Sequence, residues 1–114
     1  MATNYFINLK IASLNVNGIR YITKRKAIFL FCRRSSADLI FIQETHSGDD
    51  DCKFWKSQWG DHIYFNHASD NAAGVAILFN KFKGDVIESH LSEEGRWIIL
   101  VLKVNNVVLM VNGS

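Results

Sequence analysis

The chain contains no proline and only two cysteines, Cys32 and Cys52, among its 114 residues. Without proline, no turn is fixed by a pyrrolidine ring, so the turns must depend on Gly, Asn, Asp and Ser. Two cysteines can form at most one disulfide, and the N-terminal segment MATNYFINLK lacks the basic and apolar layout of a secretory signal. These features predict an intracellular protein with free thiols, located in the nucleus or the cytoplasm.

Long hydrophobic runs and a charge imbalance are also absent. Apolar runs such as WIILVL at 97–102 are far shorter than the roughly 20 residues of a membrane-spanning helix, so we expect no membrane association. Thirteen Lys and Arg against eleven Asp and Glu leave a net charge of +2, which does not by itself indicate a nucleic-acid partner. The histidines are scattered and neither cysteine has a neighbour at metal-ligand spacing, which argues against a zinc site.

What the sequence does contain is 48% hydrophobic residues, enough for the core of a single domain over residues 1–114. Apolar residues at helical spacing predict a helix between residues 19 and 36, with Thr23 as its N-cap and a buried stripe of Ile28, Phe31, Cys32 and Ser35. A short helix follows the acidic segment 47–51, and we expect its aromatic residues to pack on the sheet: Phe54, Trp55 and Trp59. Apolar runs bounded by Asn, Asp and Gly predict strands at 6–16, 39–43, 63–65, 74–80, 84–89, 95–104 and 106–112. Asn105-Asn106 suits a tight hairpin turn. The predicted fold class is α/β, a mixed sheet with helices on one face.

The balance of helices and strands raises the question of what covers the sheet. Several strands are apolar at consecutive positions, which is typical of strands buried on both faces, yet two helices can cover only one face. We therefore expect an uncovered sheet face, closed by a second copy of the chain in a homodimer or by another protein. The candidate contact residues are Val75, Ile77, Phe79, Ile98, Leu100, Leu102, Val108 and Met110.

Polar side chains follow two of the predicted strands. Asn15 and Asn17 come after the first strand, and Gln43-Glu44 end the run LIFIQE. Ligands gather at the carboxyl edge of strands in α/β sheets, and a carboxylate beside amides suits a hard cation such as Mg²⁺. Glu44 is also consistent with a strand end that faces water, and the asparagines with turn formation.

Basic residues gather around the first predicted helix. Six fall within residues 20–34: Arg20, Lys24, Arg25, Lys26, Arg33 and Arg34. Such a cluster is typical of a solvated helix surface, and it also fits contacts with the phosphates of DNA, for which Asn17 is a further candidate residue.

Four segments taken together resemble a known family. SLNVNGIR (13–20), DLIFIQETH (38–46), AGVAILFNK (73–81) and EGRWIILVL (94–102) are similar to the N-terminal half of the exonuclease–endonuclease–phosphatase family. The resemblance is strongest to the apurinic-type endonuclease domain of non-LTR (long interspersed) retrotransposons. It extends from about Lys10 to Asn112 and implies half of a four-layer α/β sandwich.

The resemblance also implies roles for individual residues. Glu44 matches the family's metal-binding glutamate, and Asn15 matches an asparagine that helps to hold the metal and the scissile phosphate. Gln43 stands at a supporting position, and Gly95-Arg96 match a pair with a structural role. In such enzymes Mg²⁺ stabilises charge on the phosphate while a His–Asp pair activates water.

The segments that carry the rest of that active site in the family do not occur in this sequence. None of His46, His62, His67 or His90 stands at the position of the family's general base. We therefore expect a retrotransposon-derived half-domain that is non-catalytic and binds itself, another protein or nucleic acid. The alternative is the N-terminal fragment of a Mg²⁺-dependent DNA endonuclease that needs a second half. Hydrolysis by Asn15, Glu44 and nearby residues alone is disfavoured, because loss of a water-activating base costs orders of magnitude in rate.

Overall fold

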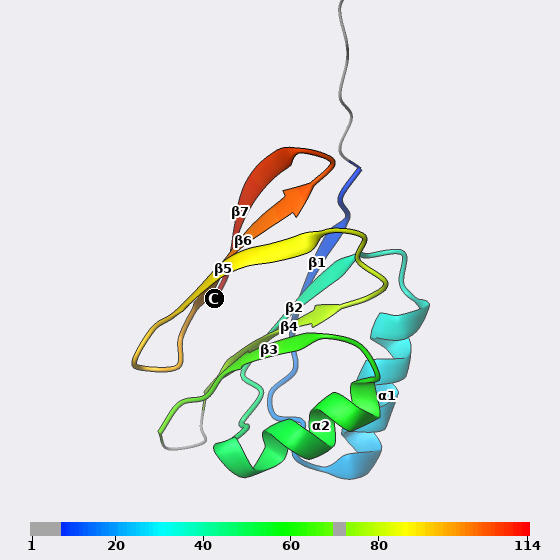
Figure 1. Ribbon diagram of the computed structural model, residues 1–114. Helices are drawn as coiled ribbons and strands as arrows, with labels where there is room; N and C mark the ends of the chain where they lie inside the picture. Colours follow the sequence, from blue (N-terminus) through cyan, green and yellow to red (C-terminus); the bar gives the residue numbers. More distant parts are fainter. Residues whose placement is uncertain (1–7, 70–72) are drawn as a thin grey trace, which may run out of the picture.

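The computed structural model describes residues 8–69 and 73–114, which form three layers (Figure 1). A four-stranded sheet lies in the middle, with two α-helices on one face and a three-stranded sheet on the other. The middle sheet has the strand order β1-β2-β4-β3, and the other has the order β5-β6-β7. The α/β class, with both helices on one face of a mixed sheet, is as predicted.

The elements follow the predicted order along the chain. The middle sheet contains β1 (Ile11–Asn15), β2 (Leu39–Gln43), β3 (Ile63–Asn66) and β4 (Val75–Phe79). The helices are α1 (Ile22–Arg34) and α2 (Cys52–Trp59), the latter preceded by the 3₁₀ turn η1 (Asp49–Asp51). The second sheet contains β5 (Asp85–Leu91), β6 (Ile98–Val104) and β7 (Val107–Gly113). Residues 6 and 7 of the first predicted strand lie outside the described residues. No helix within the described ranges has the length and hydropathy needed to cross a bilayer.

The middle sheet is covered on both faces by this chain. On the helix side, Phe29, Cys32, Trp55 and Trp59 pack against β2 and β4. On the other side, three residues of β6 contact apolar residues of β2 and β4: Ile98, Leu100 and Leu102. This corrects the expectation of an uncovered face, because the later strands form a second sheet that folds over the first instead of extending it. Of the candidate contact residues, only Val108 and Met110 are exposed.

Helix α1 differs from its prediction in its buried face. Arg25, Phe29 and Cys32 are buried, whereas Phe31 is 62% exposed. The buried face is therefore rotated relative to the predicted one. The reason is that the long side chain of Arg25 packs against α2, and the apolar pattern gave no sign that this basic residue is buried. Tyr21, not Thr23, is the N-cap residue, and no side chain caps this end.

The second helix and the last hairpin agree more closely with the sequence. Trp55 and Trp59 are buried as predicted, while Phe54 is 55% exposed. Asn105 and Asn106 both have positive φ, 48° and 68°, which is the backbone of a two-residue hairpin with the handedness that strand twist favours. The described cysteines are free thiols.

Candidate functional site at the edge of the middle sheet

Asn15 and Glu44 are brought together by the parallel pairing of β1 and β2. The register places Asn15 beside Gln43, so Glu44 is the next residue at the same carboxyl edge of the sheet. Asn15 is exposed and Glu44 is half-buried. The amide of Asn17 donates to Asn15 Oδ1 at 3.1 Å, which closes a turn directly after β1. The structure thus juxtaposes the two residues that the sequence selected.

The segment around Glu44 is held on both sides by backbone hydrogen bonds. Gly18 N–H donates to the carbonyl of Glu44 at 2.6 Å, and Ile19 N–H donates to that of Thr45 at 3.1 Å. From the other side, the amides of Thr45 and His46 donate to Gly74 and Ala73. The carboxylate of Glu44 therefore projects from a backbone that is fixed by two neighbouring segments.

Three residues of this edge have left-handed backbone, although none is glycine. Asn17, Glu44 and His46 have φ values of 47°, 55° and 55°. Such conformations cost of order 1–3 kcal/mol each and persist only where the surroundings enforce them, most often at functional sites. These three strained residues lie at the same edge of the middle sheet as Asn15.

His46 also lies at this edge, although the motif comparison gave it no role. A Cβ on Gly18 would lie 2.5 Å from His46 Nδ1, so the imidazole covers the turn after β1 and requires glycine there. Gln43 Nε2 donates to Ser13 Oγ at 2.8 Å and ties the ends of β1 and β2 together. Gly95 has a structural role, because a Cβ there would overlap the backbone of His67 and Ala68.

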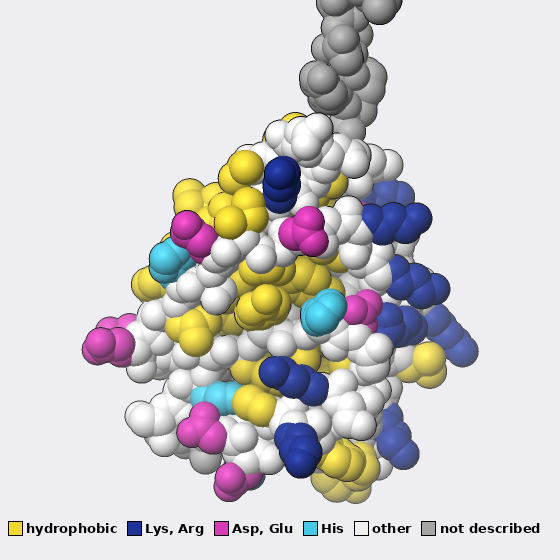
Figure 2. Space-filling view, in the orientation of Figure 1, with side chains coloured by type: hydrophobic (Ala, Val, Ile, Leu, Met, Phe, Trp, Pro, Cys, Tyr) yellow, Lys and Arg dark blue, Asp and Glu magenta, His cyan; other side chains and the backbone are white. Residues whose placement is uncertain are grey.

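The six basic residues divide into two groups. Lys and Arg side chains gather on the side of the molecule where α1 lies (Figure 2). The α1 basic surface consists of the exposed residues Arg20, Lys24, Lys26 and Arg34. Within it, Arg20 lies 3.6 Å from Asp51, and Lys24 donates to the carbonyl of Asn17 at 3.1 Å. Lys24 thereby connects this surface with the turn beside Asn15.

Arg25 and Arg33 instead have structural contacts. Arg25 is 3% exposed, and its guanidinium donates to the carbonyls of Ile19 and Arg20 and to Gln58 Oε1. Burial lowers its pKa, and Asp51 opposes this effect. Arg33 donates to Trp59 and to Asn80. These contacts occupy donors of both guanidinium groups inside the protein.

Comparison with known proteins identifies the family. The sequence pattern that defines the Endonuclease/Exonuclease/phosphatase family matches residues 12–108. The transposon TX1 uncharacterized 149 kDa protein of Xenopus laevis is 30% identical over 93 residues, which are 81% of this chain and 7% of that protein. The exodeoxyribonuclease of Bacillus subtilis is 28% identical over 108 residues, which are 90% of this chain and 41% of that enzyme.

Solved structures show the same fold. The AP endonuclease of Archaeoglobus fulgidus matches with a TM-score of 0.66 and 23% identity over 90% of this chain and 40% of its own. The AP endonuclease LMAP of Leishmania major matches with a TM-score of 0.71 and 16% identity over 93% of this chain and 39% of its own. The chain spans less than half the length of each of these four proteins. Because the family pattern covers most of its residues, the chain belongs to the Endonuclease/Exonuclease/phosphatase family.

Proposed function

We propose that this chain provides the metal- and phosphate-facing edge of a retrotransposon-derived, apurinic-type endonuclease fold, as a half-domain that binds nucleic acid without cleaving it. The main support is the parallel register of β1 and β2, which pairs Asn15 with Gln43, the residue before Glu44, at an edge with strained backbone. Family membership and the likeness to a transposon protein favour DNA as the ligand.

Glu44 and Asn15 would hold the cation, which we propose to be Mg²⁺. Within residues 8–69 and 73–114, no three His, Cys, Asp or Glu side chains form a metal-binding group. A single carboxylate still fits Mg²⁺, because this ion keeps several waters and binds through one or two carboxylates together with phosphate oxygens. When bound, the ion would neutralise negative charge on a phosphate. The half-buried Glu44 would anchor it, and the amide of Asn15 would orient the phosphate.

Water activation is where this edge is incomplete. Among the described residues, the histidine rings with side-chain hydrogen bonds contact Ser47, Cys52 and Glu88, and none is hydrogen-bonded to an aspartate. An imidazole–carboxylate pair at the phosphate would be needed to take a proton from the attacking water. We therefore expect the chain alone to bind DNA and not to hydrolyse it.

The α1 basic surface would supply the phosphate contacts next to this edge. Helix α1 has no acidic residue in its first turn and ends in Arg33 and Arg34. Each Lys or Arg that neutralises a phosphate makes binding more sensitive to salt, through release of counterions. Because Arg25 and Arg33 have internal partners, the proposal assigns DNA contacts chiefly to Arg20, Lys24, Lys26 and Arg34.

The test measures binding of the chain to a short DNA duplex by fluorescence anisotropy across a series of salt concentrations. We expect Lys26→Glu/Arg34→Glu to weaken binding and to reduce the slope of log K against log salt by about one per lost phosphate contact. The matched control is Lys83→Glu, an exposed lysine between β4 and β5. Equal binding by the α1 variant and the wild type would refute a DNA contact on this surface.

A separate experiment tests the role of Glu44. Addition of Mg²⁺ should strengthen DNA binding by the wild type and should not change DNA binding by Glu44→Gln. The control is Glu93→Gln at an exposed position, which should respond to Mg²⁺ like the wild type. Nicking of supercoiled plasmid by the chain alone in Mg²⁺, lost in Glu44→Gln, would overturn the non-catalytic proposal.

The alternative is that this edge belongs to a Mg²⁺-dependent DNA endonuclease completed by further polypeptide. The observation in its favour is that the chain covers about two fifths of the AP endonuclease structures and of the exodeoxyribonuclease. Nicking that appears only when the chain is joined to the remaining part of such a relative, and disappears with Glu44→Gln, would support this alternative. Absence of nicking in a folded fusion would favour the binding module.

Self-association is a further part of the proposal, through the two expected contact residues that remain exposed. The outer face of β7 carries Val108 and Met110, which are 60% and 74% exposed. A second copy of the chain would cover these side chains. Sedimentation equilibrium should then give twice the 13.0 kDa chain mass, and Met110→Glu should return the protein to a monomer. A wild type that stays monomeric across the dilution series would refute the dimer.

A further inference from the structure

A chain of four side chains connects the loop after β2 with the first turn of α2. Thr45 Oγ1 lies 2.7 Å from Ser47 Oγ, which lies 2.7 Å from His67 Nδ1. The other ring nitrogen, His67 Nε2, lies 2.8 Å from Cys52 Sγ. Thr45 and Ser47 are fully buried, whereas His67 and Cys52 are half-buried. A nucleophile in contact with a base, and a base oriented by a third group, is the arrangement that activates thiols and hydroxyls in enzymes.

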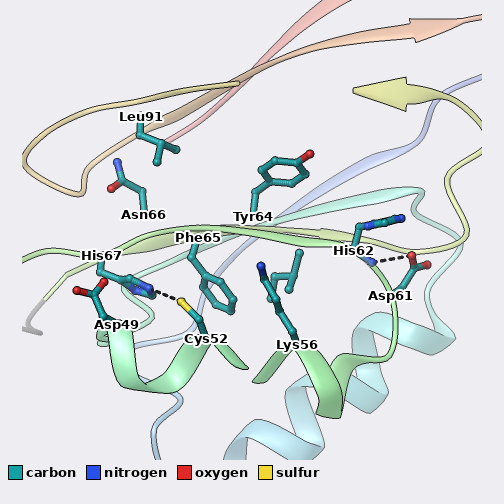
Figure 3. A pocket seen from close by; sticks show the side chains of 11 residues that line it. Asp49, Cys52, Lys56, Asp61, His62, Tyr64, Phe65, Asn66, His67 and Leu91 are labelled. Carbon is teal, nitrogen blue, oxygen red and sulfur yellow. Dashed lines mark hydrogen bonds between the residues drawn. The ribbon is translucent and has the colours of Figure 1, made fainter. Parts of the chain in front are cut away.

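Cys52, at one end of this series of hydrogen bonds, lines a cavity of about 610 Å³ along strand β3 (Figure 3). Cys52 and Lys56 lie four residues apart on one face of α2, and both line the cavity together with His67, Tyr64 and Phe65. Its volume is within the range of cavities that hold small molecules. The cavity therefore offers room for a substrate next to the sulfur, with an ammonium group one helical turn away.

The protonation states of the pair suit proton transfer during attack. Burial lowers the pKa of His67, despite the opposing charges of Asp49 and Asp51, so the imidazole is neutral at pH 7. Burial also raises the pKa of Cys52, an effect that Lys56 opposes and the two aspartates increase. A neutral imidazole thus faces a neutral thiol, and His67 Nε2 can accept the proton as the sulfur reacts.

We propose that Cys52 is a nucleophile that adds to small α,β-unsaturated carbonyl compounds bound in this cavity, with His67 as its general base. The sulfur forms a bond to the β-carbon of the substrate, and the thiol proton passes to His67 Nε2. The electron pair of the C=C bond forms the new double bond between the α-carbon and the carbonyl carbon, and the π pair of the C=O bond moves onto oxygen to give an enolate, whose charge the ammonium group of Lys56 stabilises. The proton then returns from His67 to the α-carbon, which leaves a thioether on Cys52 and needs no other reactant.

Ser47 is a positioning residue in this scheme. With its hydroxyl accepting a hydrogen bond from Nδ1–H, it holds the ring in the tautomer whose Nε2 lone pair faces the sulfur. Thr45 in turn fixes the hydroxyl of Ser47. The site uses neither Asn15 nor Glu44, so a result against DNA binding would not refute this activity of Cys52, and the reverse also holds.

The experiment follows alkylation of the full chain by acrylamide at pH 7, with mass spectrometry and peptide mapping of both cysteines. Cys52 should react faster than glutathione in the same tube, and at least a hundredfold faster than Cys32. Cys32 is the internal control, because it is 1% exposed and burial raises its pKa to about 11. His67→Asn should slow Cys52 about a hundredfold, and Ser47→Ala should slow it less. The exposed His90→Asn is the matched control and should change nothing.

A second reagent separates the role of Lys56 from that of His67. Lys56→Met should slow addition to acrylamide about tenfold and slow alkylation by iodoacetamide much less, because Lys56 acts on both reactions through the pKa of Cys52 but only the addition places charge on the carbonyl oxygen. A rate for folded His67→Asn equal to that of the wild type would overturn the proposal.

Should His67→Asn fail to fold, the pH dependence of the alkylation rate of Cys52 in the wild type tests whether His67 is the general base. General-base assistance gives a constant rate between pH 6.5 and 8, because burial lowers the pKa of His67 below this range; the charged groups that act on the pair are Asp49, Asp51 and Lys56. Attack by free thiolate alone would raise the rate about tenfold per pH unit and refute the role of His67.

Discussion

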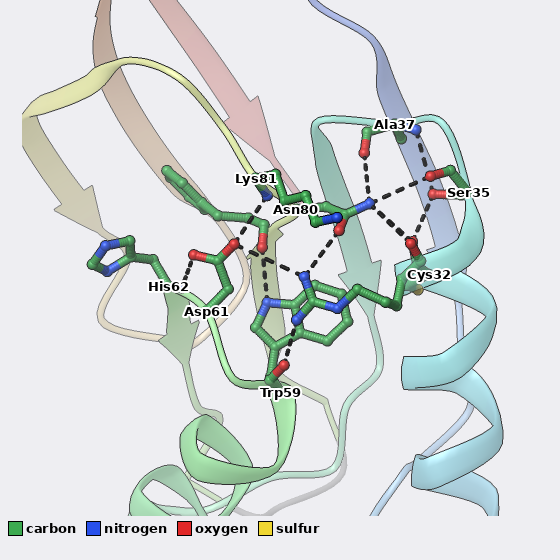
Figure 4. A network of polar contacts seen from close by, with 10 residues as sticks. Cys32, Ser35, Ala37, Trp59, Asp61, His62, Asn80 and Lys81 are labelled. Carbon is green, nitrogen blue, oxygen red and sulfur yellow. Dashed lines mark hydrogen bonds and ion pairs between the residues drawn. The ribbon is translucent and has the colours of Figure 1, made fainter.

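Arg33 Nη1 donates a hydrogen bond of 3.0 Å to Oδ1 of Asn80, which lies 47 positions further along the chain (Figure 4). The amide nitrogen of Asn80 faces the carbonyls of Cys32 and Ala37, at 3.3 and 3.1 Å. Asn80 follows β4 directly and is buried. Its side chain therefore bridges carbonyls of the last turn of α1 and of the segment that follows the helix, and joins the helix to the sheet.

Asn80→Ala should lower the free energy of unfolding by about 1–3 kcal/mol, because it leaves a charged donor and buried carbonyls without their partner. Urea unfolding followed by circular dichroism measures the change. The exposed Asn112→Ala is the control, with an expected change within about 0.5 kcal/mol. Equal stability of the Asn80 variant and the wild type would show that water replaces the amide at no cost.

Mutation of the two adjacent arginines at the end of α1 should affect different properties, stability for Arg33 and DNA binding for Arg34. The guanidinium of Arg33 lies 4.1 Å from the centre of the Trp59 ring and 3.9 Å from Asp61, whereas Arg34 is exposed. Arg33→Ala should cost about 2 kcal/mol of stability, and Arg34→Ala less than about 0.5 kcal/mol. In the anisotropy assay Arg34→Ala should weaken DNA binding at unchanged stability. The reverse pattern would show that Arg33 is the ligand contact and Arg34 the structural residue.

The packing of the two sheets predicts a third effect. Leu100 of β6 is fully buried against the middle sheet, while Met110 of β7 faces outward. Leu100→Ala should lower the free energy of unfolding by about 2–5 kcal/mol, and Met110→Ala by less than about 0.5 kcal/mol. Urea titrations of both variants test this. A small loss for Leu100→Ala would mean that the second sheet is not firmly packed on the first.

Elements that depend on local pattern could be predicted from the sequence. The continuous apolar runs at 39–43 and 74–80 indicated strands buried on both faces, and every described residue of β4 is buried. The sequence placed Asn15 and Glu44 after the ends of two strands, but the parallel pairing of β1 with β2 and the register of Asn15 with Gln43 came only from the structure. What covers the second face could not be predicted either, because an apolar strand carries no signal of which sheet it joins.

The side-chain networks escaped prediction for a related reason. His67 and Cys52 are 15 residues apart, at no spacing typical of a catalytic pair, and they meet only because α2 packs beside β3. Burial of Arg25 was hidden because a basic residue in a basic cluster has the pattern of a solvated surface. Both features depend on contacts between segments, which periodicity within one segment does not report.

The buried imidazole of His67 predicts how stability depends on pH. Burial lowers its pKa below the ordinary 6.5, so the folded protein resists a proton that the unfolded chain binds. This contribution to stability is fully present above pH 6.5 and is lost as the pH falls from 6.5 through the folded-state pKa. The free energy of unfolding, measured in urea from pH 7.5 to pH 5, should therefore decline more steeply for the wild type than for His67→Asn. The exposed Asn112→Ala, which removes no titratable group, should keep the wild-type slope. Parallel curves for His67→Asn and the wild type would mean that His67 takes up its proton equally in the folded and unfolded states, contrary to its burial against Ser47 and Cys52.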